Sequence, residues 1–137
     1  MFALTVHRSP DTLPQTTTES LFTVSGGLVR IAGVYGRVTT AIQNQVNSSY
    51  VTFQPTVGDT VSLSGQTSLS NLAVDFLIGK PGVLGYAVRP YTADSNTEPF
   101  IVGAGNVRLQ CEASNTGAIE WWLEYEPLEP GAKVVTA

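Results

Sequence analysis

The fold of this chain is decided by residues 106–126, which read NVRLQCEASNTGAIEWWLEYE. Apolar and polar side chains alternate on both sides of a turn, and a period of two residues is typical of a strand with one buried face. The expected core face carries Val107, Leu109, Cys111, Ile119, Trp121, Leu123 and Tyr125. The opposite face carries Arg108, Gln110, Glu112, Glu120, Glu124 and Glu126. We therefore expect two strands that each bury one face.

The turn between these strands predicts a β-hairpin with a defined register. A three-residue loop at 115–117, with Gly117 as the left-handed residue after a type I turn, fits the composition. A two-residue loop would place Cys111 opposite Glu120 and mix the two faces, so we prefer the longer loop. Its register pairs apolar residues with one another: Cys111 with Trp121, Leu109 with Leu123, and Val107 with Tyr125.

Trp122 interrupts the alternation, since it is a large aromatic side chain on the face otherwise given to charges. Aromatic residues flanked by charge are common at protein interfaces and at sugar-binding faces. Packing under a segment of its own chain is an equally good explanation. Among the functional explanations we favour a protein partner, because one tryptophan without a second aromatic makes a poor sugar platform.

Short apolar segments separated by turn residues recur along the rest of the chain. Residues 66–79 fit a short helical turn that runs into a strand, and Gly33 and Gly36 indicate a bulge or a close backbone approach. Many short strands without runs of helix predict an all-β protein, an antiparallel β-sandwich or jelly-roll-like domain. The other expected strands are residues 21–24, 28–41, 50–53, 60–64, 83–91 and 100–103, and 92–99 is expected to be a polar loop.

The length of 137 residues fits a single domain with flanking segments. Residues 8–18 hold two prolines and four threonines without apolar periodicity, so we expect an extended N-terminal arm over residues 1–18. The β-sandwich domain is expected to span 19–126. Pro127 and Pro130 end the last strand, and the mainly apolar residues 127–137 are expected to form a C-terminal tail.

Composition narrows the possible classes of function. The net charge is −4, which makes binding to a nucleic-acid backbone an unfavourable hypothesis. Charged residues make up only 13% of the chain, against about a quarter in ordinary domains, which suits a sheet protein whose faces meet other proteins. The first residues lack the features of a secretory signal, and we find no apolar run of membrane-spanning length. We expect a protein made in the cytoplasm, without a membrane partner.

The residue types that carry chemistry are sparse. His7 is the only histidine, so a histidine-dependent triad and a multi-histidine metal site are excluded within one chain. Cys111 is the only cysteine and is expected to face the core as a small hydrophobic residue. Glu120 and Glu124 share what reads as a solvated face, without a sign of a cleft. We therefore predict no enzyme activity, no catalytic residues, no metal and no cofactor.

Two segments resemble small virion structural proteins of tailed bacteriophages, of the head decoration or cement type. They are residues 16–43, TTTESLFTVSGGLVRIAGVYGRVTTAIQ, and residues 115–135, NTGAIEWWLEYEPLEPGAKVV. Together they span about a third of the chain, and their motifs are structural. Residues 44–105 carry no part of the resemblance.

The resemblance implies a protein on the capsid surface of a virion that performs no chemistry. Such a protein sits over junctions between major capsid protein subunits, often as a homo-trimer, and contributes interface area. The residues that we expect at protein interfaces are Trp122, Glu120, Glu124, Leu13, Val134 and Val135. The alternatives are a tail or head–tail connector protein and a carbohydrate-binding β-sandwich module.

Overall fold

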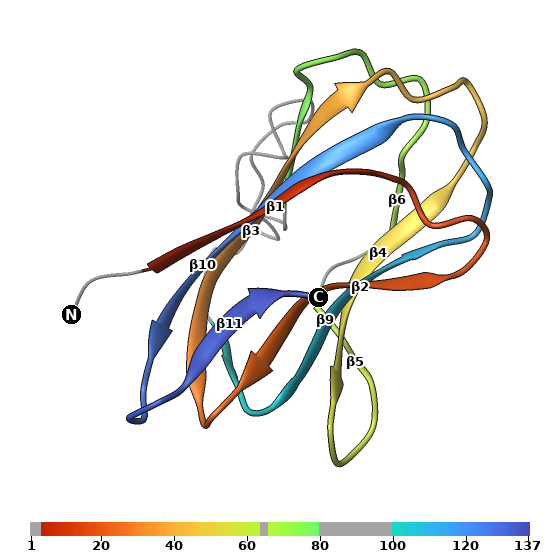
Figure 1. Ribbon diagram of the computed structural model, residues 1–137. Coiled ribbons are helices and arrows are strands. Elements are labelled where there is room, and N and C mark those ends of the chain that lie inside the picture. Colours follow the sequence, from red (N-terminus) through yellow and green to blue (C-terminus); the bar gives the residue numbers. More distant parts are fainter. Residues whose placement is uncertain (1–3, 64–65, 80–99) are drawn as a thin grey trace, which may run out of the picture.

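The computed structural model describes residues 4–63, 66–79 and 100–137, and that part of the chain is all β, without a helix that could span a membrane. Two antiparallel sheets pack as a sandwich (Figure 1), so the predicted fold class is confirmed. The strands are β1 (Leu4–Thr12), β2 (Thr18–Ser25), β3 (Val29–Thr40), β4 (Ser48–Pro55), β5 (Val61–Ser62), β6 (Thr67–Ser68), β7 (Leu77–Gly79), β8 (Phe100–Val102), β9 (Gly105–Cys111), β10 (Ala118–Pro127) and β11 (Lys133–Thr136).

Sheet 1 has the order β1-β10-β3-β7, and β8 also pairs with β3. Sheet 2 has the order β11-β2-β9-β4-β5, and β6 also pairs with β4. Both ends of the described chain are edge strands: β1 borders sheet 1, and β11 borders sheet 2. The segment predicted as an N-terminal arm thus contains β1, which pairs with β10, and the segment predicted as a tail contains β11, which pairs with β2.

The core lies between the two sheets and consists of the inward side chains of both. Every residue that we placed on the core face of the 106–126 stretch is buried, from Val107 in β9 to Tyr125 in β10. Phe22, Ile31, Val34 and Leu123 are among the largest fully buried side chains. The period-two pattern therefore identified the buried face of both strands correctly.

The predicted hairpin, in contrast, is wrong. Strand β9 pairs with β2 and β4 in sheet 2, whereas β10 pairs with β1 and β3 in sheet 1. Residues 112–117 carry the chain from one sheet to the other, so the apolar faces of β9 and β10 meet across the core. Alternation specifies which side of a strand is buried, but a hairpin and a crossover between sheets bury the same side. Gly117 does have a positive φ, 116°.

Two buried asparagines hold the crossover at residues 112–117. The Asn115 side chain donates hydrogen bonds to the carbonyl oxygens of Gln45 (2.9 Å) and Leu69 (3.0 Å). The side-chain oxygen of Asn47 accepts a hydrogen bond from the Ala113 N–H at 3.0 Å. Both asparagines are fully buried. Their amides form hydrogen bonds with backbone groups that are not paired with a neighbouring strand. The polar backbone groups of a buried loop require such partners.

Strand β3 changes the face that it buries part of the way along. Its register with β10 shifts where Glu124 pairs with Gly33 and Tyr125 with Ile31, so Ala32 is an extra residue. Ile31 and Val34 are consequently both buried, although they are three residues apart. This is the bulge that we predicted at Gly33. A strict period of two would place Val34 on the side opposite Ile31, but the bulge exchanges the two faces of the strand.

Gly36 confirms the predicted close approach. A Cβ atom at this position would lie 2.9 Å from Ile119 Cγ2 and 3.0 Å from the Trp121 ring, so only glycine fits against these core side chains. Residues 66–79 contain β6 and no helix, so the helical turn expected there is wrong, whereas the strand expected to follow it is present as β7. The strand expected at 83–91 and the loop expected at 92–99 lie outside the described residues.

We predict that Asn115→Ala destabilises the protein by about 1–3 kcal/mol, because it removes the donor of two carbonyl oxygens, one of them in a buried hydrogen bond. Urea unfolding monitored by tryptophan fluorescence measures the change. Asn44→Ala, at an exposed position of the same loop region, is the control and should change stability by less than about 0.5 kcal/mol. Equal stabilities for the two variants would show that the amide network does not hold the crossover.

Candidate functional site

The outer face of sheet 1 carries the first candidate site, centred on Trp122. Trp122 is half-buried and lies between His7 of β1 and Tyr35 of β3 in the strand register. The His7 ring stacks on it with centroids 5.0 Å apart and planes inclined by 27°. The Arg37 guanidinium lies 5.7 Å from the ring centroid. Side chains of its own chain therefore cover much of this ring, which was the second explanation considered for Trp122.

Glu120 is joined to the same cluster. Its carboxylate binds the Arg37 guanidinium at 2.7 Å and lies 3.7 Å from His7 Nε2. Only 7% of Glu120 is exposed. We expected this residue on a solvated face, and that expectation is wrong. Its burial is offset by the ion pair, since a buried carboxylate without a partner is strongly unfavourable. Glu120, Trp122, His7 and Arg37 form what we call the Trp122 cluster.

Glu124 belongs to a neighbouring pair. Burial raises the pKa of the Tyr35 phenol above its usual value, and the charge of the Glu124 carboxylate and a hydrogen bond with it raise this pKa further. Glu120 and Glu124 thus have separate partners on either side of Trp122.

The other three expected interface residues have different positions. Leu13 and Val134 are buried in the core of their own chain, whereas Val135 is exposed on β11 and points away from the core. The register explains this difference, because Val134 pairs with the buried Val24 and Val135 pairs with Thr23. Of these three, Val135 alone offers its side chain to a partner.

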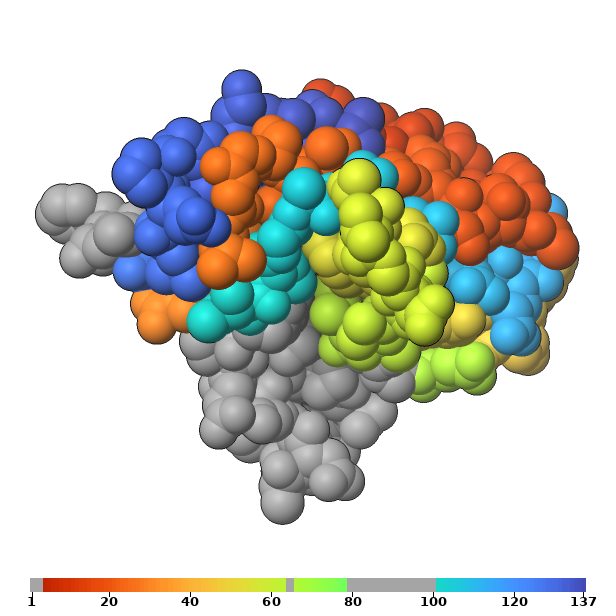
Figure 2. All heavy atoms as spheres, turned by 90° about the horizontal axis from the view of Figure 1, so that it is seen from below, coloured from red at the N-terminus to blue at the C-terminus, as the bar shows by residue number. Residues whose placement is uncertain are grey.

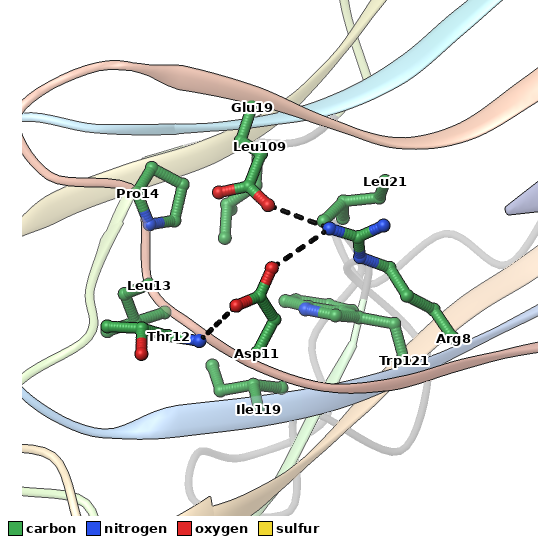
Figure 3. Close-up of a pocket in the computed structure, with 10 residues that line it drawn as sticks. All are labelled: Arg8, Asp11, Thr12, Leu13, Pro14, Glu19, Leu21, Leu109, Ile119 and Trp121. Carbon is green, nitrogen blue, oxygen red and sulfur yellow. Dashed lines mark hydrogen bonds and ion pairs between the residues drawn. The ribbon is translucent and has the colours of Figure 1, made fainter. Parts of the chain in front are cut away.

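A second cluster closes the edge of the sandwich where β1 meets sheet 2 (Figure 3). The Arg8 guanidinium binds the Glu19 carboxylate of β2 at 2.7 Å and the Asp11 carboxylate at 3.3 Å. It also donates a hydrogen bond to the carbonyl oxygen of Ala137 at 3.1 Å. Arg8 therefore links sheet 1, sheet 2 and the last described residue. We call Arg8, Asp11 and Glu19 the edge cluster.

A bulge in β1 makes the edge cluster possible. Arg8 pairs with Trp121 and Asp11 with Ile119, so Ser9 and Pro10 together oppose one residue of β10. In a regular strand, residues three apart point to opposite faces, but this bulge turns Arg8 and Asp11 to the same side. The prolines and threonines of the segment predicted an extended chain, and nothing in their pattern revealed the bulge or the partner at Glu19.

The two carboxylates of the edge cluster compete for one guanidinium. Burial raises the pKa of Glu19, and a hydrogen bond with Asp11 and its negative charge raise it further, while Arg8 opposes this effect. Because the folded-state pKa is raised, Glu19 favours the folded state below its ordinary pKa. That contribution is lost as the pH rises through the raised value.

The cavity between the edge cluster and the core is too small for a substrate. Its volume is about 10 Å³, about the space of one water molecule, and apolar side chains such as Leu109 and Trp121 form much of its wall. Among the described residues, no group of three His, Cys, Asp or Glu side chains could hold a metal ion. This cavity can therefore hold one water. A second, open hollow of about 280 Å³ lies on the other side of the edge cluster and is lined by His7, Arg8 and Asp11.

Cys111 is buried as predicted. Burial raises the pKa of its thiol above the usual value, and the Ser49 hydroxyl lies 3.4 Å from the sulfur. A thiol with a raised pKa is a poor nucleophile at neutral pH.

Comparisons of the chain with protein-family models, with curated proteins and with solved structures find no match.

We predict that Arg8→Ala lowers the free energy of unfolding by about 1–3 kcal/mol, since it removes a partly buried guanidinium that binds two carboxylates and a carbonyl. Arg30→Ala is the matched control, because Arg30 is an exposed arginine with one carboxylate partner, Glu126. Its loss should cost at most about 1 kcal/mol. Urea denaturation at neutral pH compares the two; an equal loss would mean that the edge cluster does not clamp the sheets.

We also predict that Glu124→Gln lowers the pKa of Tyr35, because it removes the negative charge beside the phenol. The pKa should stay above the usual value, since burial is the larger cause. NMR titration of the Tyr35 ring carbon measures it. Glu126→Gln is the control, because Glu126 pairs with Arg30, and it should leave the pKa unchanged. An unchanged pKa in Glu124→Gln would remove Glu124 as a cause.

Proposed function

We propose that this chain is a non-enzymatic structural protein of a bacteriophage virion, a decoration or cement protein that binds the outside of the head. In this proposal it contacts the major capsid protein at subunit junctions and stabilises the shell, as a homo-oligomer with a trimer favoured. It is synthesised in the host cytoplasm and resides on the capsid surface.

One observation carries the proposal: the two segments that resemble phage head proteins are neighbours in space. Residues 16–43 contain β2 and β3, and residues 115–135 contain β10 and most of β11. Strand β10 pairs with β3 in sheet 1, and β11 pairs with β2 in sheet 2. The resemblance therefore covers one connected part of the sandwich that includes strands of both sheets, as a shared structural unit would.

The distribution of exposed apolar side chains also supports a binding role. Turns from both sheets lie together at one end of the molecule, which Figure 2 shows in blue, orange, cyan and yellow-green. Leu28 and Leu128 belong to two of these turns, which are joined by a hydrogen bond from the Leu128 N–H to the Leu28 carbonyl. Both are exposed, and Val57 in the turn after β4 is 89% exposed. Exposed apolar groups that gather at one end are typical of protein contact sites.

The polar clusters favour a structural role over chemistry. The carboxylates of Glu19 and Glu120 are each held by an arginine of the same chain, and the cavity between the edge cluster and the core has the size of one water. The cover of His7 and Arg37 over Trp122 gives a sugar ring little free aromatic surface. A tail or connector location remains the principal alternative, because the same contact surfaces would serve there.

The proposal is tested by deleting the gene from the phage that encodes the chain and comparing the purified particles with those of the parent. We expect the parent heads to contain the chain by mass spectrometry and to show extra density on their outer surface by cryo-electron microscopy. The deleted heads should lose this density and release DNA at lower temperature, and added purified chain should restore both properties. Density on the tail, or no chain in the particle, would refute a role in head decoration.

A further inference from the structure

The outer face of sheet 2 differs from the rest of the surface in its chemistry. Across β2, β9 and β4, the side chains that point away from the core are short or uncharged, with one exception in the middle. They are Thr18, Ser20, Thr23, Asn106, Arg108, Gln110, Tyr50, Thr52 and Gln54. We call this set the Arg108 face. Glu112 follows the end of β9 and makes no ion pair with Arg108 in the described structure.

Arg108 is the exception, and it lacks the partner that comparable arginines have. Arg8, Arg30 and Arg37 each bind a carboxylate of their own chain. Within the part of the chain that the structure describes, Arg108 has no carboxylate within ion-pair distance. Its Nε–H, like that of Arg8, is buried without an acceptor. Its cross-strand neighbours, Ser20 and Thr52, carry only hydroxyl groups.

The side chain is already ordered against the sheet. Arg108 is half-buried, its Nε is inaccessible to solvent, and Thr52 beside it is only 3% exposed. A guanidinium that lies along the sheet loses little conformational freedom when a partner binds, and its planar donors match a carboxylate. Arginine at the centre of an uncharged patch is also a frequent hot spot of protein interfaces.

We propose that the Arg108 face is the surface that docks on the particle, and that its occupant is a protein surface that presents a carboxylate to Arg108. This inference rests on the proposed function and names the face that performs it. The charge of Arg108 determines the chemistry of the partner, because it is unmatched within its own face. Short side chains on the remaining strands let a partner approach the sheet closely.

Other occupants fit this face less well. A nucleic-acid backbone calls for several cations, whereas the face has one arginine and the chain has a net charge of −4. A sugar would need aromatic surface, and Tyr50 is the one aromatic residue of the Arg108 face. A second copy of this chain is the other protein that could supply a carboxylate, so the test includes the oligomeric state.

The experiment measures the affinity of the fluorescently labelled full chain for heads purified from the gene-deleted phage. Arg108→Ala should weaken binding at least about 30-fold, the size expected for a hot-spot arginine. Arg108→Lys should recover only part of the affinity, because lysine keeps the charge but loses the paired donors. Arg30→Ala is the matched control on the outer face of sheet 1 and should bind as the unaltered chain does. Urea unfolding verifies that all three variants fold.

The possible outcomes separate this inference from the function on which it rests. If the unaltered chain binds the heads and folded Arg108→Ala binds equally well, the docking face is wrong and the proposed function survives. If the unaltered chain does not bind the heads, both proposals fail. If Arg108→Ala changes the oligomeric state in analytical ultracentrifugation while its affinity per subunit is unchanged, the face joins copies of the chain, which overturns the inference. Binding to a glycan array that Arg108→Ala abolishes would also overturn it.

Discussion

The crossing of the chain between the two sheets at residues 112–117 is the constraint on which the rest of the structure depends. It places β9 and β10 in different sheets, so their apolar faces enclose the core from opposite sides. Asn47 and Asn115 make the crossing possible, because their buried amides satisfy backbone groups that have left the ladder. Had the same residues formed a hairpin, one sheet would contain both strands, and the second apolar layer would have to come from elsewhere.

The crossing leaves the sandwich with an open side between β1 and β11, which the edge cluster closes. Stacked sheets lie about 10 Å apart, so a long side chain is needed to reach from one edge strand to the other sheet. Arg8 spans this gap and binds Glu19 of β2. The bulge at Ser9 and Pro10 also disrupts the regular edge of β1, which protects it from pairing with a strand of another molecule. The bulge at Ser9 and Pro10 thus both positions the residues that close the edge and protects the edge from pairing with another molecule.

The two outer faces of the sandwich have different chemistry as a result of this arrangement. On sheet 1, aromatic and charged side chains bind one another, as in the ion pair of Glu120 with Arg37 and the stacking of His7 on Trp122. On sheet 2, the side chains are mostly uncharged, and Arg108 has no carboxylate partner among the described residues. A face that satisfies its own charges gains little from a partner, whereas an unmatched guanidinium can gain one or two strong hydrogen bonds.

Local patterns predicted what depends on a single strand, and they failed where partners distant in sequence decide. Period-two alternation identified the buried faces of β9 and β10, and Gly33 marked a bulge, because side-chain direction is a local property. Which strands lie next to β9 and β10 depends on residues distant in sequence, and the alternation within each strand does not determine it.

For the site residues too, the sequence predicted local properties but not the contacts with residues distant in the chain. Trp122 stood out in the sequence because it broke a pattern, but its stacking partner His7 lies 115 positions away, in the segment expected to be an extended arm. Leu13 and Val134 were expected at interfaces because they lie near the ends of the chain, yet strand pairing and the closing of the edge bury them. Arg108 was assigned to a polar face correctly, but the absence of an acid opposite it became visible only from the register with β2 and β4.

The crossing can be tested directly by NMR, from backbone nuclear Overhauser effects in the isotopically labelled chain. In the sandwich, the backbone of Leu109 should give cross-strand signals to Val51 and Glu19, and the backbone of Leu123 should give them to Val34 and Val6. Backbone signals between Leu109 and Leu123 should be absent, because these residues lie in different sheets. Strong backbone signals between Leu109 and Leu123, as a hairpin would give, would contradict the crossing and the two distinct outer faces that follow from it.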